Sequence, residues 1–590
     1  MENTNKSSFL KGIICTYKKI AKSNKYFTSI ITMILTLVTA LGIVIVVKNL
    51  MPGEETITIG TNPAEEAFFN GNYNLAIEEY TKLQGKNLWP EYDMKIAEIY
   101  SIKGDYVESN ELISKVYEAR NKSIDSNNRE ELKEQDEKIT NEVVLTSFIN
   151  GESKKAIDYG ELFLKNNPTY KTLKNTMFTI YISNNEKEKA KEILKSYDNS
   201  NSEEDLITIS KMNILLGNWE NGLTLLKDAC DKNEDPLITL DAVKQLSLCD
   251  KDRIVKEILK LQDKYNDEKI YRIWLAQIYS LDKKNVSKSI DIINKLKNEN
   301  LNETEKFSLD FIEYTAYKNI NDNKTAINCL KEIIDRDDES YINWYMLSLY
   351  DYECRRYKDA FENAKKSILL NKDYPNVYGE LIPNILLKES KKAEEGKIDN
   401  TISYFRTALE KELFNPEILI NTAKYYQDIV KDSNKALEYY ELASKIDSKN
   451  PDIYYSSALI KINNQREDEG IELLNKSIEL DSSNAKYYRM LGSVYLNKGK
   501  NEKAINAIRS AYAIDENDII NLNNAGYYYI CVEGDADRAL VNFKAAYKDI
   551  KEDTDSKVKE MITDNYNRIK TYKKDKSSVL TISQFKLIEN

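Results

Sequence analysis

Side chains suited to acid–base or nucleophilic chemistry are either absent from this sequence or isolated within it. There is no histidine, which removes the commonest general base and the histidine-dependent zinc sites and catalytic triads. Adjacent carboxylates such as Glu78–Glu79 and Glu203–Glu204 recur, and we expect them on solvated helix faces. No P-loop, no G-x-G-x-x-G after a strand and no G-x-S-x-G occurs. The sequence therefore predicts no catalytic residue and no cofactor, and indicates a protein that is not an enzyme.

The cysteines are too scattered to form a metal site or a disulfide framework. No two of them are arranged as C-x-x-C, so we expect no metal site and interpret the thiols as small buried hydrophobic groups. The six cysteines are Cys15, Cys230, Cys249, Cys329, Cys354 and Cys531. Their scarcity does not decide the cellular compartment.

Composition favours a long, helix-rich chain. A chain of 590 residues exceeds what one hydrophobic core supports, so several domains or a repeat array are expected. Only 18 glycines and 9 prolines are present, which disfavours turn-dense β folds. The net charge of −11 does not suggest a nucleic-acid partner.

Residues 26–47, "YFTSIITMILTLVTALGIVIVV", are uncharged and are bounded by Lys25 and Lys48. As a helix this segment would measure about 33 Å, close to the thickness of a bilayer core. A cleaved signal peptide is the main alternative. The apolar run is longer than such peptides use, and no A-x-A-like cleavage site follows it. The segment is predicted to be a transmembrane helix that acts as an uncleaved signal anchor.

Lysine bias predicts the orientation of this anchor. Residues 1–25 contain six lysines and a single acid, Glu2, so the positive-inside rule places this basic tail in the cytoplasm. Because the tail carries +5 of the total of −11, the remaining residues carry −16. We therefore expect a single-pass protein of the cell membrane, with a linker at 48–56 and an acidic extracytoplasmic part.

One ten-residue pattern recurs along that part. "GNYNLAIEEY" at 71–80 is followed by related stretches that begin at Gly104, Gly151, Gly217, Gly499 and Gly534. Gly71 and Gly104 are 33 residues apart, and "NEKEKAKEIL" (185–194) fills the longer gap between Gly151 and Gly217. A period of this size indicates a solenoid of two-helix units.

The clearest copy is "NAKYYRMLGSVYLNKGKNEKAINAIRSAYAIDEND", residues 484–518. Its first helix carries Leu491 and Gly492, and its second carries Ala504 at helical spacing from Ile508. Gly492 and Ala504 are small, so we expect the two antiparallel helices to approach closely there. Gly499 is expected to adopt a positive φ at the turn between them.

This pattern resembles the tetratricopeptide repeat (TPR), whose motif is W-x2-L-G-x2-Y, then A-x3-F-x2-A, then P. Trp344, Leu347 and Ala360 match it, although Ser348 replaces the glycine. A later unit matches with Leu522, Gly526, Tyr529, Ala539, Phe543 and Ala546. The resemblance covers most of the chain and implies an all-α fold, a right-handed α-solenoid of about 14 helical hairpins. Other helical hairpin arrays remain an alternative for its middle.

The repeat register gives the domain boundaries. The solenoid is predicted at 57–553, with insertions near 120–137 and 388–397 and with degenerate units near 203–235, 236–268 and 307–340. Residues 554–590 are predicted to begin as an amphipathic capping helix and to end in a short tail whose structure the sequence leaves open.

TPR arrays commonly hold an extended peptide or a partner's helix on a concave surface lined by first helices. Asn524 lies where peptide-binding members often place an asparagine that binds the ligand backbone. Ser456 and Met490 hold the matching positions in the two preceding units, so no asparagine ladder is expected. By register, the partner-binding candidates are Tyr455, Leu459, Arg489, Ser493, Asn523, Asn524 and Tyr527.

The resulting functional hypothesis is a non-enzymatic, membrane-anchored TPR scaffold on the extracytoplasmic side of a bacterial membrane, serving envelope assembly or secretion. The alternative is a cytosol-facing TPR receptor or co-chaperone adapter anchored by its N-terminus, against which the lysine bias argues. An enzyme without known motifs, or a peptide-sensing regulator, is a further alternative. The partner's identity and the oligomeric state do not follow from the sequence.

Overall fold

The computed structural model describes part of the chain. The described residues are 58–84, 89–124, 130–197, 202–232, 235–265, 268–335, 340–390, 400–552, 554–574 and 584–588. The predicted tail (1–25), membrane helix (26–47) and linker (48–56) lie outside them. Of the helices that are described, none is both long enough and apolar enough to cross a membrane.

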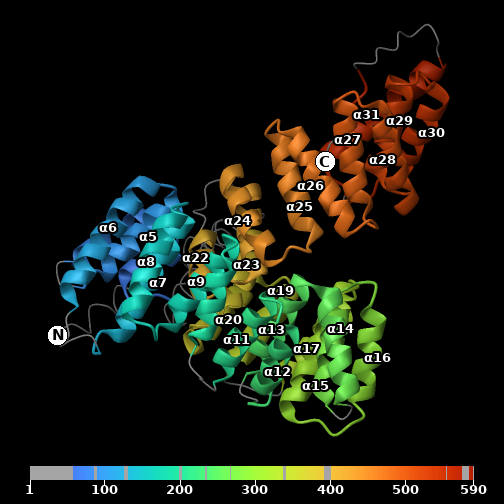
Figure 1. The fold of residues 1–590 in the computed structure, drawn as a ribbon. Coiled ribbons are helices and arrows are strands. Elements are labelled where there is room, and N and C mark those ends of the chain that lie inside the picture. Colours follow the sequence, from blue (N-terminus) through green and yellow to red (C-terminus); the bar gives the residue numbers. More distant parts are fainter. Residues whose placement is uncertain are drawn as a thin grey trace, which may run out of the picture. The chain divides into compact units, whose positions relative to one another are not determined.

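Every regular element of the described residues is helical, which confirms the all-α prediction. The helices follow one another as antiparallel pairs along the chain (Figure 1). The first nine pairs are α3 (Pro63–Phe69) with α4 (Tyr73–Gln84), α5 (Glu91–Lys103) with α6 (Tyr106–Ser123), α7 (Lys133–Ile149) with α8 (Ser153–Asn166), α9 (Lys171–Ser183) with α10 (Lys187–Lys195), α11 (Glu203–Leu215) with α12 (Trp219–Cys230), α13 (Pro236–Cys249) with α14 (Lys251–Lys264), α15 (Lys269–Ser280) with α16 (Val286–Leu296), α17 (Glu303–Asn319) with α18 (Asn323–Ile334), and α19 (Tyr341–Glu353) with α20 (Tyr357–Leu370).

Five more pairs and one further helix complete the described part of the chain. They are the π-helical turn η1 (Val377–Leu381) and α21 (Ile382–Ser390) with α22 (Thr401–Lys411), α23 (Pro416–Tyr425) and η2 (Tyr426–Val430) with α24 (Ser433–Ile446), α25 (Pro451–Asn463) with α26 (Glu467–Leu480), α27 (Ala485–Asn497) with α28 (Asn501–Ile514), α29 (Ile519–Cys531) with α30 (Ala536–Lys548), and α31 (Ser556–Lys574). The degenerate units fold as the same kind of hairpin.

The recurring glycine lies at the turn between the helices of a pair. All six glycines that open the repeated pattern have positive φ, for example +65° at Gly499, which confirms the expectation for that residue. In other hairpins the same turn conformation is adopted by a residue with a side chain, namely Asn185, Asn321, Arg355, Lys431 and Gln465. Hairpins without the glycine therefore form the same left-handed turn, although the sequence pattern does not mark it there.

Small residues bring the two helices of a pair together. A Cβ atom on Gly492 would lie 3.0 Å from Ile508 Cγ1, and one on Gly526 would lie 2.7 Å from the Phe543 ring, so these glycines are needed for close approach. Ser348, which departs from the repeat motif, is fully buried and donates a hydrogen bond to the Ala360 carbonyl at 2.7 Å. Serine fits there because it is small and its hydroxyl finds an acceptor across the pair.

Hairpins far apart in the sequence also pack against one another. Helix α22 contacts α3, α5 and α7. The Ser403 hydroxyl donates to the Phe68 carbonyl at 2.8 Å, and the Asn400 amide donates to the Phe69 carbonyl at 2.7 Å. These contacts join elements more than 300 residues apart, and no repeat pattern indicates them.

The predicted insertion at 120–137 is largely helical where it is described. Helix α6 continues to Ser123 and α7 begins at Lys133. The Arg120 guanidinium forms a two-pronged ion pair with the Asp136 carboxylate, at 2.6 Å and 2.5 Å, and both side chains are buried. The second insertion, 388–397, lies mostly outside the described residues.

Candidate peptide-binding site

The predicted groove residues lie on the first helices of the last three pairs, α25, α27 and α29. Tyr455 and Arg489 make contacts within these helices. The Tyr455 ring packs at 5.2 Å from that of Tyr487, and Arg489 Nη1 donates to the Asp518 carboxylate at 2.6 Å. Tyr527 is half-buried. These three residues are therefore on the expected helices, and the Tyr455 hydroxyl lies beside the Arg489 guanidinium.

Ser493, Asn523 and Asn524 are brought together, and all three are 0% exposed. They are buried because residues 584–588 of the same chain lie over them. The Ile588 N–H donates to Asn524 Oδ1 at 3.0 Å, and Asn524 Nδ2 donates to the Ile588 carbonyl at 2.7 Å. The Ser493 hydroxyl donates to the same carbonyl at 3.3 Å. Three of the residues that the sequence singled out thus bind the main chain of residues 584–588, and their binding of a partner stays a prediction.

A second asparagine, Asn565, makes the same pair of main-chain hydrogen bonds with Lys586, two residues before Ile588 in the bound segment 584–588. The Lys586 N–H donates to Asn565 Oδ1 at 3.0 Å, and Asn565 Nδ2 donates to the Lys586 carbonyl at 2.8 Å. Asn523 Nδ2 also donates to this carbonyl, at 3.3 Å, and its Oδ1 accepts from Asn565 Nδ2 at 2.9 Å.

An asparagine amide is chemically suited to this task. It presents one carbonyl acceptor and an NH₂ donor, which match the C=O and N–H of one residue of an extended chain. Alternate residues of an extended segment turn these groups to the same side. Asn565 and Asn524 bind alternate residues, Lys586 and Ile588, and so read the main chain as a neighbouring strand would.

Three side chains of residues 584–588 make apolar contacts, and the half-buried Leu587 packs against the cluster that includes Tyr455 and Tyr528. Phe585 stacks on Phe543 with ring centroids 5.7 Å apart and an interplanar angle of 4°. Ile588 is 2% exposed and belongs to a cluster with Leu522 and Ile562. Between them, Lys586 Nζ lies 3.2 Å from the Asp564 carboxylate. The site therefore combines main-chain recognition with an aromatic and an aliphatic contact.

Sequence reasoning missed Asn565 and the segment itself. Asn565 lies on α31, which has no place in the repeat motif, and it is fully buried. An asparagine among the buried residues Val558, Ile562 and Ile569 of an amphipathic helix was the available signal, because a polar group on an apolar face needs a partner.

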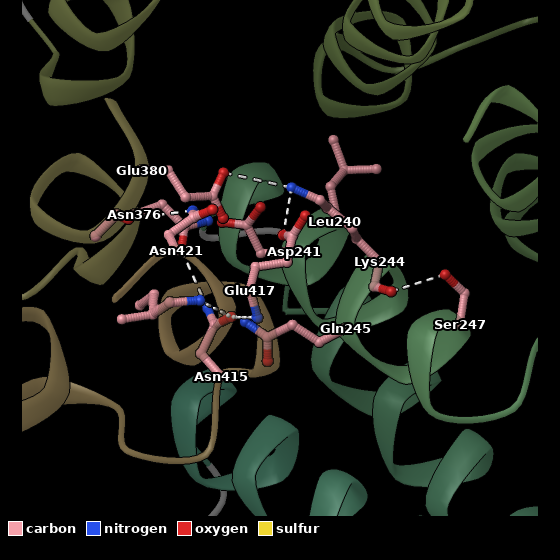
Figure 2. Close-up of polar contacts among 12 residues, drawn as sticks. Leu240, Asp241, Lys244, Gln245, Ser247, Asn376, Glu380, Asn415, Glu417 and Asn421 are labelled. Atoms are coloured by element: carbon pink, nitrogen blue, oxygen red, sulfur yellow. Dashed lines mark hydrogen bonds and ion pairs between the residues drawn. The ribbon is translucent and has the colours of Figure 1, made fainter. Parts of the chain in front are cut away.

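A second polar region lies among the earlier hairpins. A cavity of about 900 Å³ is bounded by α7, α9, α11 and α13 and by residues around α22. Gln245 is 2% exposed, and its amide donates to Glu412 at 3.2 Å. Figure 2 shows the neighbouring cluster, in which Lys244 Nζ lies 3.4 Å from Glu380 and 2.5 Å from Glu417. These ion pairs link α13 to η1 and α23.

Burial raises the pKa of three acids of this region, Asp241, Glu380 and Glu410. Burial raises the pKa of Asp241 to about 7, although Lys244 and the hydrogen bond donated by the Tyr374 hydroxyl partly offset it. Burial and the nearby Glu98 carboxylate raise the pKa of Glu410. The Lys244 ammonium is held in its charged form by Glu380, Glu417 and Asp241, against the effect of burial, so its pKa lies well above its ordinary value. The cluster is a structural network that ties distant hairpins together.

The expectation that adjacent carboxylates lie on solvated helix faces is wrong for Glu203. Glu203 is 3% exposed, and its carboxylate accepts a hydrogen bond from the Asp235 N–H at 3.0 Å. The five cysteines within the described ranges are free thiols, of which Cys249 and Cys329 are buried. Burial raises the pKa of Cys230 to about 12 and that of Cys531 to about 11. No group of side chains suited to a metal ion occurs in the part of the chain that the structure describes.

Residues 451–484 and 485–518 match the sequence profile of the tetratricopeptide repeat family. These two units match the tetratricopeptide repeat. The two matched TPR units are the pairs α25/α26 and α27/α28, and the second of them supplies Ser493 to the candidate site. No curated protein matches the chain.

Several solved structures are similar to it. The APC/C hetero-tetramer Cut9–Hcn1 aligns at 13% identity over 86% of this chain and 95% of that chain, with a TM-score of 0.40. MamA aligns at 26% identity over 28% and 92%, with a TM-score of 0.25. Pseudomonas aeruginosa pilF aligns at 14% identity over 38% and 97%, with a TM-score of 0.32. Because these TM-scores are below 0.5, we draw no conclusion from them about function.

Proposed function

We propose that this protein is a non-enzymatic scaffold that binds protein or peptide partners in extended conformation on its last TPR units. TPR units form scaffolds suited to protein–protein interaction. The observation that carries the proposal is the pairing of Asn524 and Asn565 with the main chain of residues 584–588. A surface that reads the backbone of an extended segment is a peptide-binding surface.

We further propose that residues 26–47 anchor the protein in a bacterial membrane and that the solenoid lies on the extracytoplasmic side. The support is the uncharged segment itself and the excess of lysine in residues 1–25. Partners would then belong to envelope assembly or secretion.

Protease treatment of intact protoplasts tests the orientation. Antibodies against the N-terminal tail and against the solenoid would follow the fragments. We expect the solenoid to be digested while a fragment containing residues 1–47 survives. Protection of the solenoid until lysis would place it on the cytosolic side and favour the receptor or adapter alternative.

Site-specific crosslinking tests the scaffold function. A photo-crosslinking amino acid in place of half-buried Tyr527, beside the bound segment, should capture partners in intact cells. The matched control places it at Tyr512, which is 49% exposed on α28. Equal capture from both positions would argue against binding at the groove.

A further inference from the structure

We propose that residues 584–588 are a built-in competitor that occupies the TPR groove until a partner peptide of similar chemistry displaces it. This inference rests on the proposed peptide-binding function and specifies what the site selects. It assigns to the groove an extended peptide with an aromatic residue, a basic residue next to it, and a branched aliphatic residue three positions after the aromatic one.

The mode of binding favours a replaceable ligand. The segment is held through the N–H and C=O groups of Lys586 and Ile588, which every residue except proline possesses. Another extended peptide can make these hydrogen bonds without any change in the groove.

The side-chain contacts define the preferred partner. Phe585 occupies an aromatic contact with Phe543, and Ile588 occupies an aliphatic one. The Asp564 carboxylate, 3.2 Å from Lys586 Nζ, favours a cation at the position between them. Replacement of any of these three side chains in a competing peptide should weaken its binding.

An intramolecular ligand competes through its local concentration. Only nine residues separate α31 from the segment, and a ligand tethered this closely in the chain has an effective concentration of about a millimolar or more. A free peptide with the same contacts must exceed that concentration, whereas a partner with additional contacts along the solenoid need not. The segment would therefore exclude peptides that bind the groove alone and admit partners that also contact other parts of the solenoid.

The test uses the full-length protein in a mild detergent and a fluorescent peptide of residues 581–590, TISQFKLIEN. In the double variant Phe585→Asp and Ile588→Asp the internal segment should leave the groove, because two charges cannot occupy the apolar contacts. Fluorescence anisotropy should show the peptide binding to this variant at least about tenfold more tightly than to the wild type.

Matched variants localise the binding. Asn524→Ala or Asn565→Ala added to the double variant should lose most of the binding, because each substitution removes two hydrogen bonds to one peptide residue and leaves only the longer bond from Ser493 or Asn523. Asn506→Ala, at an exposed position on α28, should leave binding unchanged. Circular dichroism establishes that each variant is folded.

A measurement on the wild-type protein does not depend on the folding of any variant. Excess peptide should accelerate hydrogen exchange at the Lys586 and Ile588 amides of the protein itself, since displacement leaves them without acceptors.

Three results would overturn the proposal. They are absence of peptide binding to the folded double variant, equal binding to the wild type and the double variant, and a wild-type dimer that dissociates when Phe585 and Ile588 are replaced, which would show exchange of the segment between copies. Capture of partners by the Tyr527 crosslink in any of these cases would leave the scaffold function intact and reject only the competition.

Discussion

Five hairpins place a residue other than glycine in the left-handed turn that six other hairpins give to glycine. A side chain in this conformation costs about 1–2 kcal/mol, because its Cβ approaches the following carbonyl oxygen. Gln465, with φ of +61°, carries this cost in the turn between α25 and α26. The repeat tolerates it because the helices on both sides fix the turn.

Replacing Gln465 with glycine should therefore stabilise the protein. We expect the free energy of unfolding to rise by about 0.5–1 kcal/mol, since relief of the turn strain exceeds the extra entropy of an unfolded glycine. Urea denaturation followed by circular dichroism measures the effect. The reverse change, Gly499→Ala, should lower the free energy of unfolding by a similar amount, and a gain there would contradict the argument.

At the scale of elements, α22 is the helix that distant hairpins surround, and it has buried side chains on every face. Arg406 is 3% exposed. Its Nε lies 3.5 Å from Glu98 and 3.7 Å from Glu410, and its Nη2 donates to the Thr146 hydroxyl. The Arg406 guanidinium thus joins α22 to α5 and α7, two helices that are distant from α22 in the sequence.

Arg406→Met should be severely destabilising. It removes the guanidinium from the buried Glu98 carboxylate, which keeps only Lys95 as a cationic partner, and breaking a buried pair typically costs about 3–5 kcal/mol. Limited proteolysis should show faster cleavage near α22, and the denaturation midpoint should fall. Arg509→Met, at an exposed position on α28, should change the free energy of unfolding by no more than about 0.5 kcal/mol. Equal effects of the two substitutions would reject the proposed role of Arg406.

At the scale of the whole molecule, titration of the cavity acids couples stability to pH. Burial raises the pKa of Asp241 to about 7, far above the value of about 3.9 for a solvated aspartate. Its contribution to stability is therefore fully present below about pH 4 and is lost as the pH rises toward 7, because the folded state must then hold a charge in the cavity wall.

Asp241→Asn should remove this pH dependence. We expect the stability of the variant relative to the wild type to rise by about 3 kcal/mol between pH 4 and pH 7, since an amide keeps a hydrogen bond to Tyr374 without a charge. Denaturation of both proteins across this range measures the difference. Asp231→Asn, at an exposed carboxylate on the C-terminal side of α12, should show no comparable trend. A constant difference between the Asp241 variant and the wild type would contradict the linkage.

The sequence by itself determined the helical hairpins, their turns and the helices that carry the candidate site. These features depend on residues close in the chain, such as Gly492 and Ala504, whose types repeat with the period of the unit. For the same reason Ser493 and Asn524, which lie on the first helices of adjacent units, could be assigned to one surface in advance.

Only the tertiary structure decided what occupies that surface and how distant hairpins interlock. Ile588 meets Asn524 across 64 residues, and Ser403 meets Phe68 across 335. The second contact depends on the accumulated rotation of many stacked pairs, and the first depends on where the chain returns after α31; no local pattern specifies either. Asn565 illustrates the limit, since its sequence shows only a polar residue on an apolar helix face, and its partner is visible only once the chain has folded back.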